Sequence, residues 1–259
     1  MKIGIYTKKE NNEIVDLIKA ECAKRHFELD NDHPDYVFSI GGDGTFLRAV
    51  HKYIDMLDKV CFIGINNGSL GFLYDFNKDN LPTIFEKLSL DKLPIKEHAL
   101  LKGHAIYKNS QEEFFALNEI RIENPFHTLI SKVLINDEEL ETYRGNGLIV
   151  SSSIGSSAYN KSLGGALVDP DMNALELTEV AGIQNNAFRS LGSSLVISGD
   201  KKVSFTGELT NSVVGYDFLS FHKDDELLKV EISYSNKKVK IAQSEDHSYI
   251  QKVRKSFVL

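Results

Sequence analysis

The residues with the clearest chemical potential form the string Gly-Gly-Asp-Gly-Thr at 41–45. An apolar run typical of a buried strand, residues 36–40, precedes the string, and apolar residues at helical spacing follow it. Glycines at a strand-to-helix turn let the backbone approach a phosphate chain, and the free amides of a helix N-terminus favour anions. Asp43 in such a loop suits a general base, a metal ligand or a helix cap. The string predicts a nucleotide site, although a plain turn with a capping Asp explains it about equally well.

A second polar loop, Asn-Asn-Gly-Ser-Leu-Gly-Phe-Leu at 66–73, follows another predicted strand at 60–65. Open parallel sheets bind ligands at the carboxyl ends of their strands, so this loop and the 41–45 turn are expected side by side. The alternative is an ordinary strand-to-helix loop with Phe72 in the core. Neither a P-loop nor a Gly-x-Gly-x-x-Gly dinucleotide motif is present, so a different kind of nucleotide site is required.

Two further segments carry polar residues in predicted β-structure. In residues 114–122, strand alternation would place Asn118 on one face and Glu119 on the other. Asn is unfavourable in strands, which indicates either a binding residue or a solvated edge. The segment 144–160 is rich in small hydroxylic side chains that suit ribose and phosphate, with a flexible serine-rich loop as the alternative. Ser157 lies in no Gly-x-Ser-x-Gly elbow, so a hydrolase nucleophile is not indicated.

The predicted elements change in type near residue 93. Before it, strands at 3–6, 36–40 and 60–65 alternate with helices, one beginning after Asn11 and Asn12 and one at 81–88, which predicts a parallel sheet with helical crossovers. After it the chain is mostly β, and residues 174–188 are open between helix and loop. The predicted strands of this half are 100–107, 114–122, 129–136, 148–151, 195–198, 230–234 and 239–242.

Composition narrows the classes of partner and compartment. The 259 residues carry a formal charge of −7 and a pI near 5.6, which argues against nucleic acid as the partner. Cys22 and Cys61 lie in apolar stretches and are expected to be buried and reduced, as in the cytoplasm. The N-terminus does not read as a signal peptide, and no apolar run approaches the ~20 residues of a membrane span. The sequence therefore predicts a soluble, cytoplasmic protein with no membrane partner.

Taken in order, four segments resemble those of the NAD kinase family, and the resemblance covers nearly the whole chain. They are Gly-Gly-Asp-Gly-Thr at 41–45, the Gly-Ile-Asn to Phe-Leu segment at 64–73, Asn-Glu at 118–119, and Arg-Gly-Asn-Gly with its serine-rich continuation at 144–159. The resemblance implies a Rossmann-like α/β domain at 1–95, a C-terminal β-sandwich domain at 96–242, and a tail at 243–259 that returns to the first domain.

The resemblance also implies an activity: transfer of the γ-phosphoryl group of ATP to the adenosine 2′-hydroxyl of NAD, with Mg²⁺ or another divalent metal bound with ATP. Asp43 would be the base, with Gly44 facing the phosphates and Phe72 packing against adenine. Asn118 and Glu119 would bind ribose and pyrophosphate. The other implied nucleotide-binding residues are Ser157, Ala158, Tyr159, Asn160, Lys161 and Ser162, with Arg144 and Asn146 approaching from a neighbouring strand or subunit. No side chain is assigned to a metal, and a homo-oligomer, tetramer or dimer, is implied.

The sequence departs from the family pattern in four places, of which Ser152-Ser153-Ile154 in place of Thr-Pro-x and Ser157 in place of Thr mostly preserve hydrogen bonding. Asn146 replaces the Asp of Arg-Gly-Asp-Gly, which removes a charge but keeps a hydrogen-bond acceptor, and Val214 and Tyr216 alter a contact near 216. Two alternatives therefore stand beside NAD kinase: a lipid kinase of the diacylglycerol or sphingoid type, which shares the Gly-Gly-Asp-Gly-Thr loop, and a non-catalytic NAD-binding regulator. The intact Asp43 argues against loss of catalysis.

Overall fold

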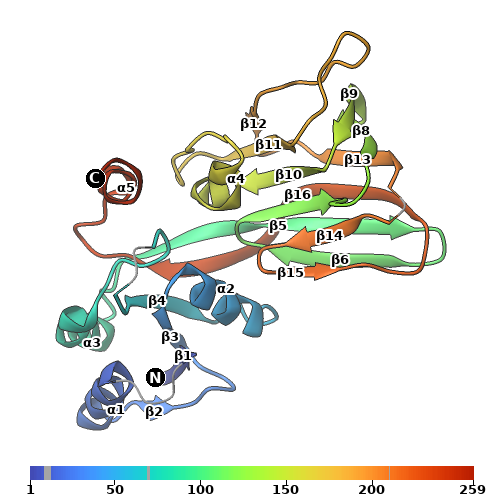
Figure 1. Ribbon diagram of the computed structural model, residues 1–259. Helices are drawn as coiled ribbons and strands as arrows, with labels where there is room; N and C mark the ends of the chain where they lie inside the picture. The colour runs from blue at the N-terminus through green and yellow to red at the C-terminus, as the bar shows by residue number, and fades with distance from the viewer. Residues whose placement is uncertain (9–12, 69–70, 210) are drawn as a thin grey trace. The chain divides into compact units, whose positions relative to one another are not determined.

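A computed structural model describes residues 1–8, 13–68, 71–209 and 211–259. The chain divides into two compact units (Figure 1). Unit 1 comprises Met1–His98 and Lys237–Leu259, and unit 2 comprises Ala99–Asn236. Of the loop predicted at 66–73, Ser69 and Leu70 lie outside the described residues. Asn11 and Asn12, after which the first helix is predicted to begin, also lie outside them.

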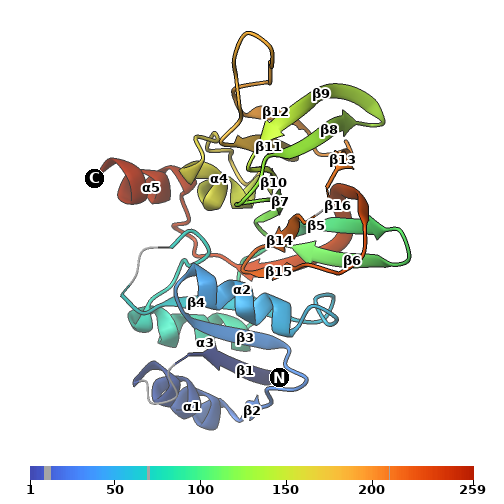
Figure 2. The ribbon, with the colours of Figure 1, turned by 45° about the vertical axis from the view of Figure 1, so that its right-hand side comes forward.

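Unit 1 is built on a parallel sheet in the order β2-β1-β3-β4-β16, and Figure 2 shows the first four of these strands in sequence. Only the last part of β16 belongs here, through Lys240 and Ile241, which pair with β4. The strands are β1 (Lys2–Thr7), β2 (Glu28–Leu29), β3 (Tyr36–Gly41), β4 (Cys61–Asn66) and β16 (Leu227–Ala242). The predicted α/β arrangement of the N-terminal part is confirmed.

Helices cover both faces of the unit 1 sheet. Apolar side chains of α1 and α3 form one core cluster with β3 and β4, in which the Phe38 and Phe85 rings stack at 5.2 Å. α2 packs on the opposite face, where Phe46 lies 5.8 Å from Phe62. The side chain of Leu17 in α1 is exposed, whereas that of its neighbour Ile18 is buried. The helices are α1 (Glu13–Arg25), α2 (Asp43–Lys52) and α3 (Leu81–Ser89), the last preceded by the 3₁₀ turn η1 (Lys78–Asn80).

Unit 2 is a sandwich of two sheets. The first has the antiparallel order β12-β11-β10-β7-β14-β15, and the second contains β16-β13-β8-β9 together with β5 and β6. Apolar residues from both sheets meet in one buried cluster, for example Ile120 and Phe205. The strands are β5 (Ile95–Tyr107), β6 (Gln111–Ala116), β7 (Glu119–Glu123), β8 (Leu129–Ile135), β9 (Glu138–Gly145), β10 (Gly147–Ser152), β11 (Ala174–Val180), β12 (Leu195–Ser198), β13 (Val203–Glu208), β14 (Val213–Tyr216) and β15 (Leu219–Phe221).

Three sequence predictions for this half are wrong. Residues 114–122 are not one strand, because the chain bends at 117–118 between β6 and β7, which lie in different sheets. Residues 174–180, left open between helix and loop, form β11, and Figure 1 shows a long loop between β11 and β12. The strands expected at 230–234 and 239–242 are one strand, β16, because the polar residues between them continue the ladder.

The C-terminal tail returns to unit 1, as the resemblance implied. It contains α5 (Tyr249–Val253), capped by the Ser248 hydroxyl, which accepts a hydrogen bond from the Gln251 amide. A π-helical turn, η3 (Arg254–Val258), follows directly. The tail thereby adds a helix to unit 1 from the C-terminal end of the chain. The other helices described in this unit all end before residue 90.

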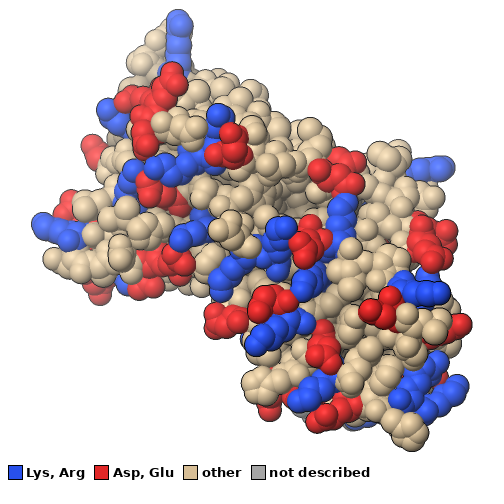
Figure 3. All heavy atoms as spheres, turned by 180° about the vertical axis from the view of Figure 1, so that it is seen from behind, with Lys and Arg blue, Asp and Glu red and all other residues tan. Residues whose placement is uncertain are grey.

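The distribution of surface charge and the burial of the two cysteines agree with the expectations from the composition. Figure 3 shows Lys and Arg interspersed with Asp and Glu across the face in view. Cys22 and Cys61 are buried free thiols. Within the part of the chain that the structure describes, no helix combines the length and the apolar character needed to cross a membrane.

Candidate active site

The Gly-Gly-Asp-Gly turn joins β3 to α2. β3 ends at Gly41, whose φ of +153° is a conformation that residues with a side chain rarely adopt. A Cβ at Gly41 would also lie only 2.6 Å from the Thr45 hydroxyl oxygen. The extended residue Gly42 is the N-cap of α2, which begins at Asp43. At the exposed Gly44, a Cβ would meet no described atom within 4 Å, so this part of the turn faces open space.

Asp43 is held at the start of α2 by the backbone of the neighbouring loop. Its Oδ2 accepts a hydrogen bond from the Phe72 amide at 2.9 Å, and its Oδ1 accepts one from the Leu73 amide at 3.0 Å. Each carboxylate oxygen keeps a second lone pair for a substrate proton. Burial raises the pKa of Asp43, while the two amides and the charge of Lys252 oppose that rise. A carboxylate fixed in this way is suited to general-base catalysis.

The loop that follows β4 lies directly beside the Asp43 turn, which confirms the expected proximity of the two loops. Gly64 in β4 leaves room for this loop, because a Cβ there would lie 2.8 Å from the Leu73 carbonyl oxygen. The Tyr74 hydroxyl donates a hydrogen bond to the Gly42 carbonyl at 2.9 Å and ties the loop to the turn at a second point. The two loops form one site at the carboxyl edge of the parallel sheet.

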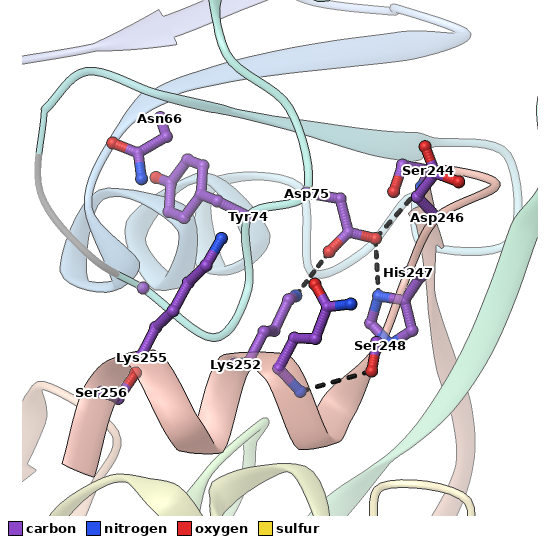
Figure 4. A pocket seen from close by; sticks show the side chains of 12 residues that line it. Asn66, Tyr74, Asp75, Ser244, Asp246, His247, Ser248, Lys252, Lys255 and Ser256 are labelled. Carbon is purple, nitrogen blue, oxygen red and sulfur yellow. Dashed lines mark hydrogen bonds and ion pairs between the residues drawn. The ribbon is translucent and has the colours of Figure 1, made fainter. Parts of the chain in front are cut away.

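A pocket of about 200 Å³ opens between this loop and the tail (Figure 4). Gly71 and Tyr74 line it from the loop side, and Lys252 lines it from α5. The Phe72 ring stacks on Phe257 of the tail, with 5.5 Å between ring centroids. The structure therefore places an aromatic ring of the tail against the side chain that the resemblance assigns to adenine.

Unit 2 carries its own polar cluster, which begins at Asn118. Asn118 lies in the bend between β6 and β7, where the amides of Leu117 and Asn118 donate to the two carboxylate oxygens of Asp217 at 2.9 and 2.8 Å. These bonds replace the ladder hydrogen bonds that a continuous strand would supply. The strand alternation expected for Asn118 and Glu119 is therefore wrong, since Asn118 is in no strand.

Glu119 is a buried carboxyl group with an unused oxygen. Glu119 is only 4% exposed, and its Oε2 has no hydrogen-bond partner among the described residues. The other oxygen lies 3.7 Å from an Arg121 guanidinium nitrogen. Burial, followed by the charge of Asp217, raises the pKa of Glu119 to about 8. A buried polar atom without a partner is a candidate to bind a ligand hydroxyl.

The serine-rich segment packs directly on the Asn118 bend. It leaves β10 through the 3₁₀ turn η2 (Ile154–Ser157) and continues into α4 (Tyr159–Ser162). Gly155 lies so close to the bend that a Cβ there would be 2.1 Å from the Asn118 carbonyl oxygen. The Ser152 hydroxyl donates to the Leu117 carbonyl at 2.6 Å. The structure thus brings the Asn-Glu and serine-rich segments together.

Side chains of the predicted strip 157–162 differ in their surroundings. Tyr159 is exposed, and its hydroxyl donates to Glu123 at 3.3 Å. Asn160 is fully buried: it donates to Glu176 at 2.8 Å and accepts from the Thr178 hydroxyl at 2.7 Å. Tyr159 is therefore accessible to a ligand, whereas the Asn160 amide fixes α4. The remaining members are the half-buried Ser157, Ala158 and Lys161 and the exposed Ser162.

Arg144 and Asn146 lie apart from the Asn118 bend within the chain. Asn146 precedes β10 and donates to the carbonyl of Asn124, which directly follows β7, at 3.2 Å. Asn118 lies at the opposite end of β7. The Arg144 guanidinium lies over the Phe188 ring, 4.4 Å from its centroid. One copy of the chain does not bring these two residues to the Asn-Glu segment.

Four residues that build these sites were not identified from the sequence: Tyr74, Asp75, Asp217 and Lys252. Asp75 carried a signal, because a lone carboxylate within the apolar run 72–76 requires a partner when buried. Its partner is Lys252, at 2.5 Å. Lys252 gave no comparable signal, since nothing in the local sequence of a short tail helix shows which surface it covers.

The sequence matches two family models. The ATP-NAD kinase N-terminal domain matches residues 7–93, and the ATP-NAD kinase C-terminal domain matches residues 117–244. The NAD kinase of Leuconostoc citreum is 32% identical and aligns over 100% of this chain and 98% of the relative. That of Limosilactobacillus reuteri is 34% identical, with the same coverage of 100% and 98%. Neither the lipid-kinase alternative nor the regulator alternative gains support from these matches.

Solved structures show the same fold. Yeast NADH kinase complexed with NADH superimposes with a TM-score of 0.84 at 18% identity, covering 99% of this chain and 87% of that one. An NAD kinase from Archaeoglobus fulgidus in complex with ATP gives a TM-score of 0.80 at 23% identity, covering 98% and 99%. The Rossmann-like domain and the β-sandwich domain predicted from the sequence are thus confirmed. This chain belongs to the NAD kinase family.

Proposed function

We propose that this NAD kinase uses Asp43 as the base that removes the proton from the adenosine 2′-hydroxyl of NAD while the γ-phosphoryl group of ATP is transferred to that oxygen. The observation that carries the proposal is the fixed carboxylate at the turn between β3 and α2. Two amides orient it, at 2.9 and 3.0 Å, and each oxygen keeps a lone pair. Phosphoryl transfer of this kind depends mainly on positioning and on charge stabilisation.

In the proposed mechanism, two groups stabilise the negative charge of the ATP phosphates. The first is the turn itself, whose exposed Gly44 and helix N-terminus offer amides to phosphate oxygens. The second is Mg²⁺ or another divalent ion, which bridges phosphate oxygens of ATP. The ion is proposed to arrive with ATP as its complex, and no side chain is assigned to it.

NAD binding is proposed for the cluster in unit 2. The unpaired Oε2 of Glu119 and the side chain of Asn118 would form hydrogen bonds with ribose hydroxyls, which can both donate and accept. The exposed Tyr159 ring offers a stacking surface, and Arg121 lies 5.8 Å from that ring and adds a positive charge for pyrophosphate. Phe72 remains the proposed adenine contact, which would require the ring of Phe257 to share or yield its position.

We also propose a cytoplasmic homo-oligomer, tetramer or dimer. Exposed aromatic side chains in unit 2 support association: Phe126 is 88% exposed and Phe188 is 38% exposed. A second copy would offer Arg144 and Asn146 a way to approach the nucleotide. Sedimentation at micromolar concentration distinguishes the three states, and a monomer at all concentrations would contradict this part. Buried free thiols at Cys22 and Cys61 fit the reducing compartment.

The experiment is NADP formation from NAD, ATP and Mg²⁺, followed with an NADP-specific dehydrogenase. Asp43→Asn is expected to lower kcat by about 10²–10⁴-fold, the usual contribution of a general base, with NAD binding retained in calorimetry. Asp58→Asn, an exposed Asp in the same unit, controls for the change of charge. Undiminished turnover by Asp43→Asn would remove Asp43 from the mechanism, and an inactive wild type would contradict the proposed reaction.

A further inference from the structure

A single peptide group connects the Asp43 carboxylate to the C-terminal tail. The amide of Leu73 donates to Asp43 Oδ1 at 3.0 Å, and the carbonyl of the same peptide, that of Phe72, accepts from Lys252 Nζ at 2.7 Å. Hydrogen bonds at both ends of one peptide fix its plane, and each polarises the other. The orientation of the Asp43 carboxylate is thus coupled to the position of Lys252.

Lys252 is itself fixed, unlike an ordinary surface lysine. Its ammonium group forms an ion pair with Asp75 Oδ1 at 2.5 Å, and the two side chains are 17% and 5% exposed. The second oxygen, Asp75 Oδ2, accepts from the Ser244 amide at 3.1 Å and lies 2.7 Å from His247 Nδ1. Figure 4 shows Lys252 and His247 converging on Asp75 from the tail. A charge-assisted bond with this degree of burial is strong enough to hold the Phe72 carbonyl.

We propose that Lys252, anchored by Asp75, is a positioning residue for phosphoryl transfer: it orients the peptide between Phe72 and Leu73, whose amide in turn orients the Asp43 carboxylate. The inference rests on the proposed role of Asp43 as the base. It assigns the tail a task in the reaction, in addition to completing the fold of unit 1.

The charged surroundings define what a pH profile would report. The charge of Lys252 lowers the pKa of Asp43, and the charge of Asp43 in turn acts on Tyr74. The pKa of Tyr74 is raised by burial, so its hydroxyl stays neutral. Burial, aided by positive charges that include Lys252, lowers the pKa of His98 to about 4. Lys252 therefore influences the acid limb of kcat through the pKa of Asp43.

The test compares Lys252→Met with Arg254→Met, which removes the same charge from the exposed residue two positions along. Lys252→Met is expected to lower kcat by about 10–10²-fold, because a carboxylate displaced by up to 1 Å loses near-attack geometry. The KM for NAD should change less than threefold. The acid limb of the kcat profile of Lys252→Met should move to higher pH, since loss of a nearby positive charge raises the pKa of Asp43. Lys252→Arg should return the limb toward that of the wild type, and Arg254→Met should resemble the wild type throughout.

A purely structural role for Lys252 predicts different results. Lys252→Met leaves Asp75 as a buried carboxylate without its lysine, which reduces stability. If that variant does not fold, Asp75→Asn/Lys252→Met is measured in its place, because it removes both charges. Folded protein with wild-type kcat and an unmoved acid limb in either variant would overturn the inference. Loss of activity in Asp43→Asn beside full activity in Lys252→Met would leave the proposed function standing and refute only the role of Lys252.

Discussion

Glu119 gives this protein a dependence of stability on pH that opposes the usual behaviour of carboxylates. Burial, with the charge of Asp217, raises its pKa from an ordinary 4.5 to about 8. Between these two values the folded protein retains a proton that the unfolded chain has released. The stabilising contribution is fully present below pH 4.5 and is lost as the pH rises toward 8. The free energy of unfolding should therefore fall across this interval.

The size of this effect follows from the same two values. The interval from 4.5 to about 8, at about 1.4 kcal/mol for each pH unit, sets an upper limit of about 5 kcal/mol. The pKa of about 8 already includes the favourable charge of Arg121, which lies 3.7 Å from the carboxylate, whereas water that reaches the ionised group lowers the energetic cost further. We expect a measured effect of about 2–4 kcal/mol, which is a large fraction of the total stability of most domains.

Glu119→Gln tests this reasoning, because the amide keeps the shape of the carboxyl group and cannot ionise. Urea unfolding of both proteins, followed by circular dichroism at pH 5, 7 and 9, gives the difference in unfolding free energy at each pH. The difference should favour the variant by an additional 2–4 kcal/mol or so between pH 5 and 9. Glu208→Gln, at an exposed position on β13, controls for the altered net charge. A difference that stays constant, or that favours the wild type as pH rises, would refute the argument from burial.

Two other substitutions probe the site at single contacts. Gly71→Ala would place a Cβ 2.6 Å from Asp43 Oδ1, so kcat should fall by about tenfold or more with little change in the KM for NAD. An unchanged kcat would show that the loop moves without displacing the Asp43 carboxylate. Asn160→Ala removes one hydrogen-bond partner from Glu176 and one from Thr178, both buried, and should cost about 2–4 kcal/mol of unfolding free energy. A stable Asn160→Ala protein with weakened NAD binding would instead support a direct contact with the ligand.

Sequence patterns identified the parts of unit 1 well because each pattern there has one dominant cause. The runs at 36–40 and 60–65 are buried on both faces of a parallel sheet, and such strands are continuously apolar. Gly41 and Gly64 occur where a side chain would collide with Thr45 or with the Leu73 carbonyl. The proximity of the two polar loops then follows from the rule that parallel strands end on the same edge of a sheet.

The errors in unit 2 arise from long-range contacts that a local pattern does not contain. The bend at Asn118 depends on Asp217, about a hundred residues later, whose carboxylate binds two amides. The burial of both faces of β11 also depends on a distant residue, because the polar Glu176 and Thr178 are buried through their bonds to Asn160. A pattern of apolar and polar letters assigns such residues to the surface, whereas their hydrogen bonds permit burial.

The discontinuity of unit 1 has a consequence for how the protein emerges from the ribosome. Residues 1–98 are synthesised first, but their sheet lacks the end of β16, and Asp75 lacks Lys252, until all of unit 2 has been made. A nascent chain stalled before residue 237 would expose the edge of β4 and a carboxylate without its lysine. The second sheet of unit 2 also needs β16 (Leu227–Ala242), so neither unit has its full sheet until the C-terminal part of the chain has been made. The surroundings of the Asp43 turn, although encoded early, are therefore completed only when the C-terminal tail has been made.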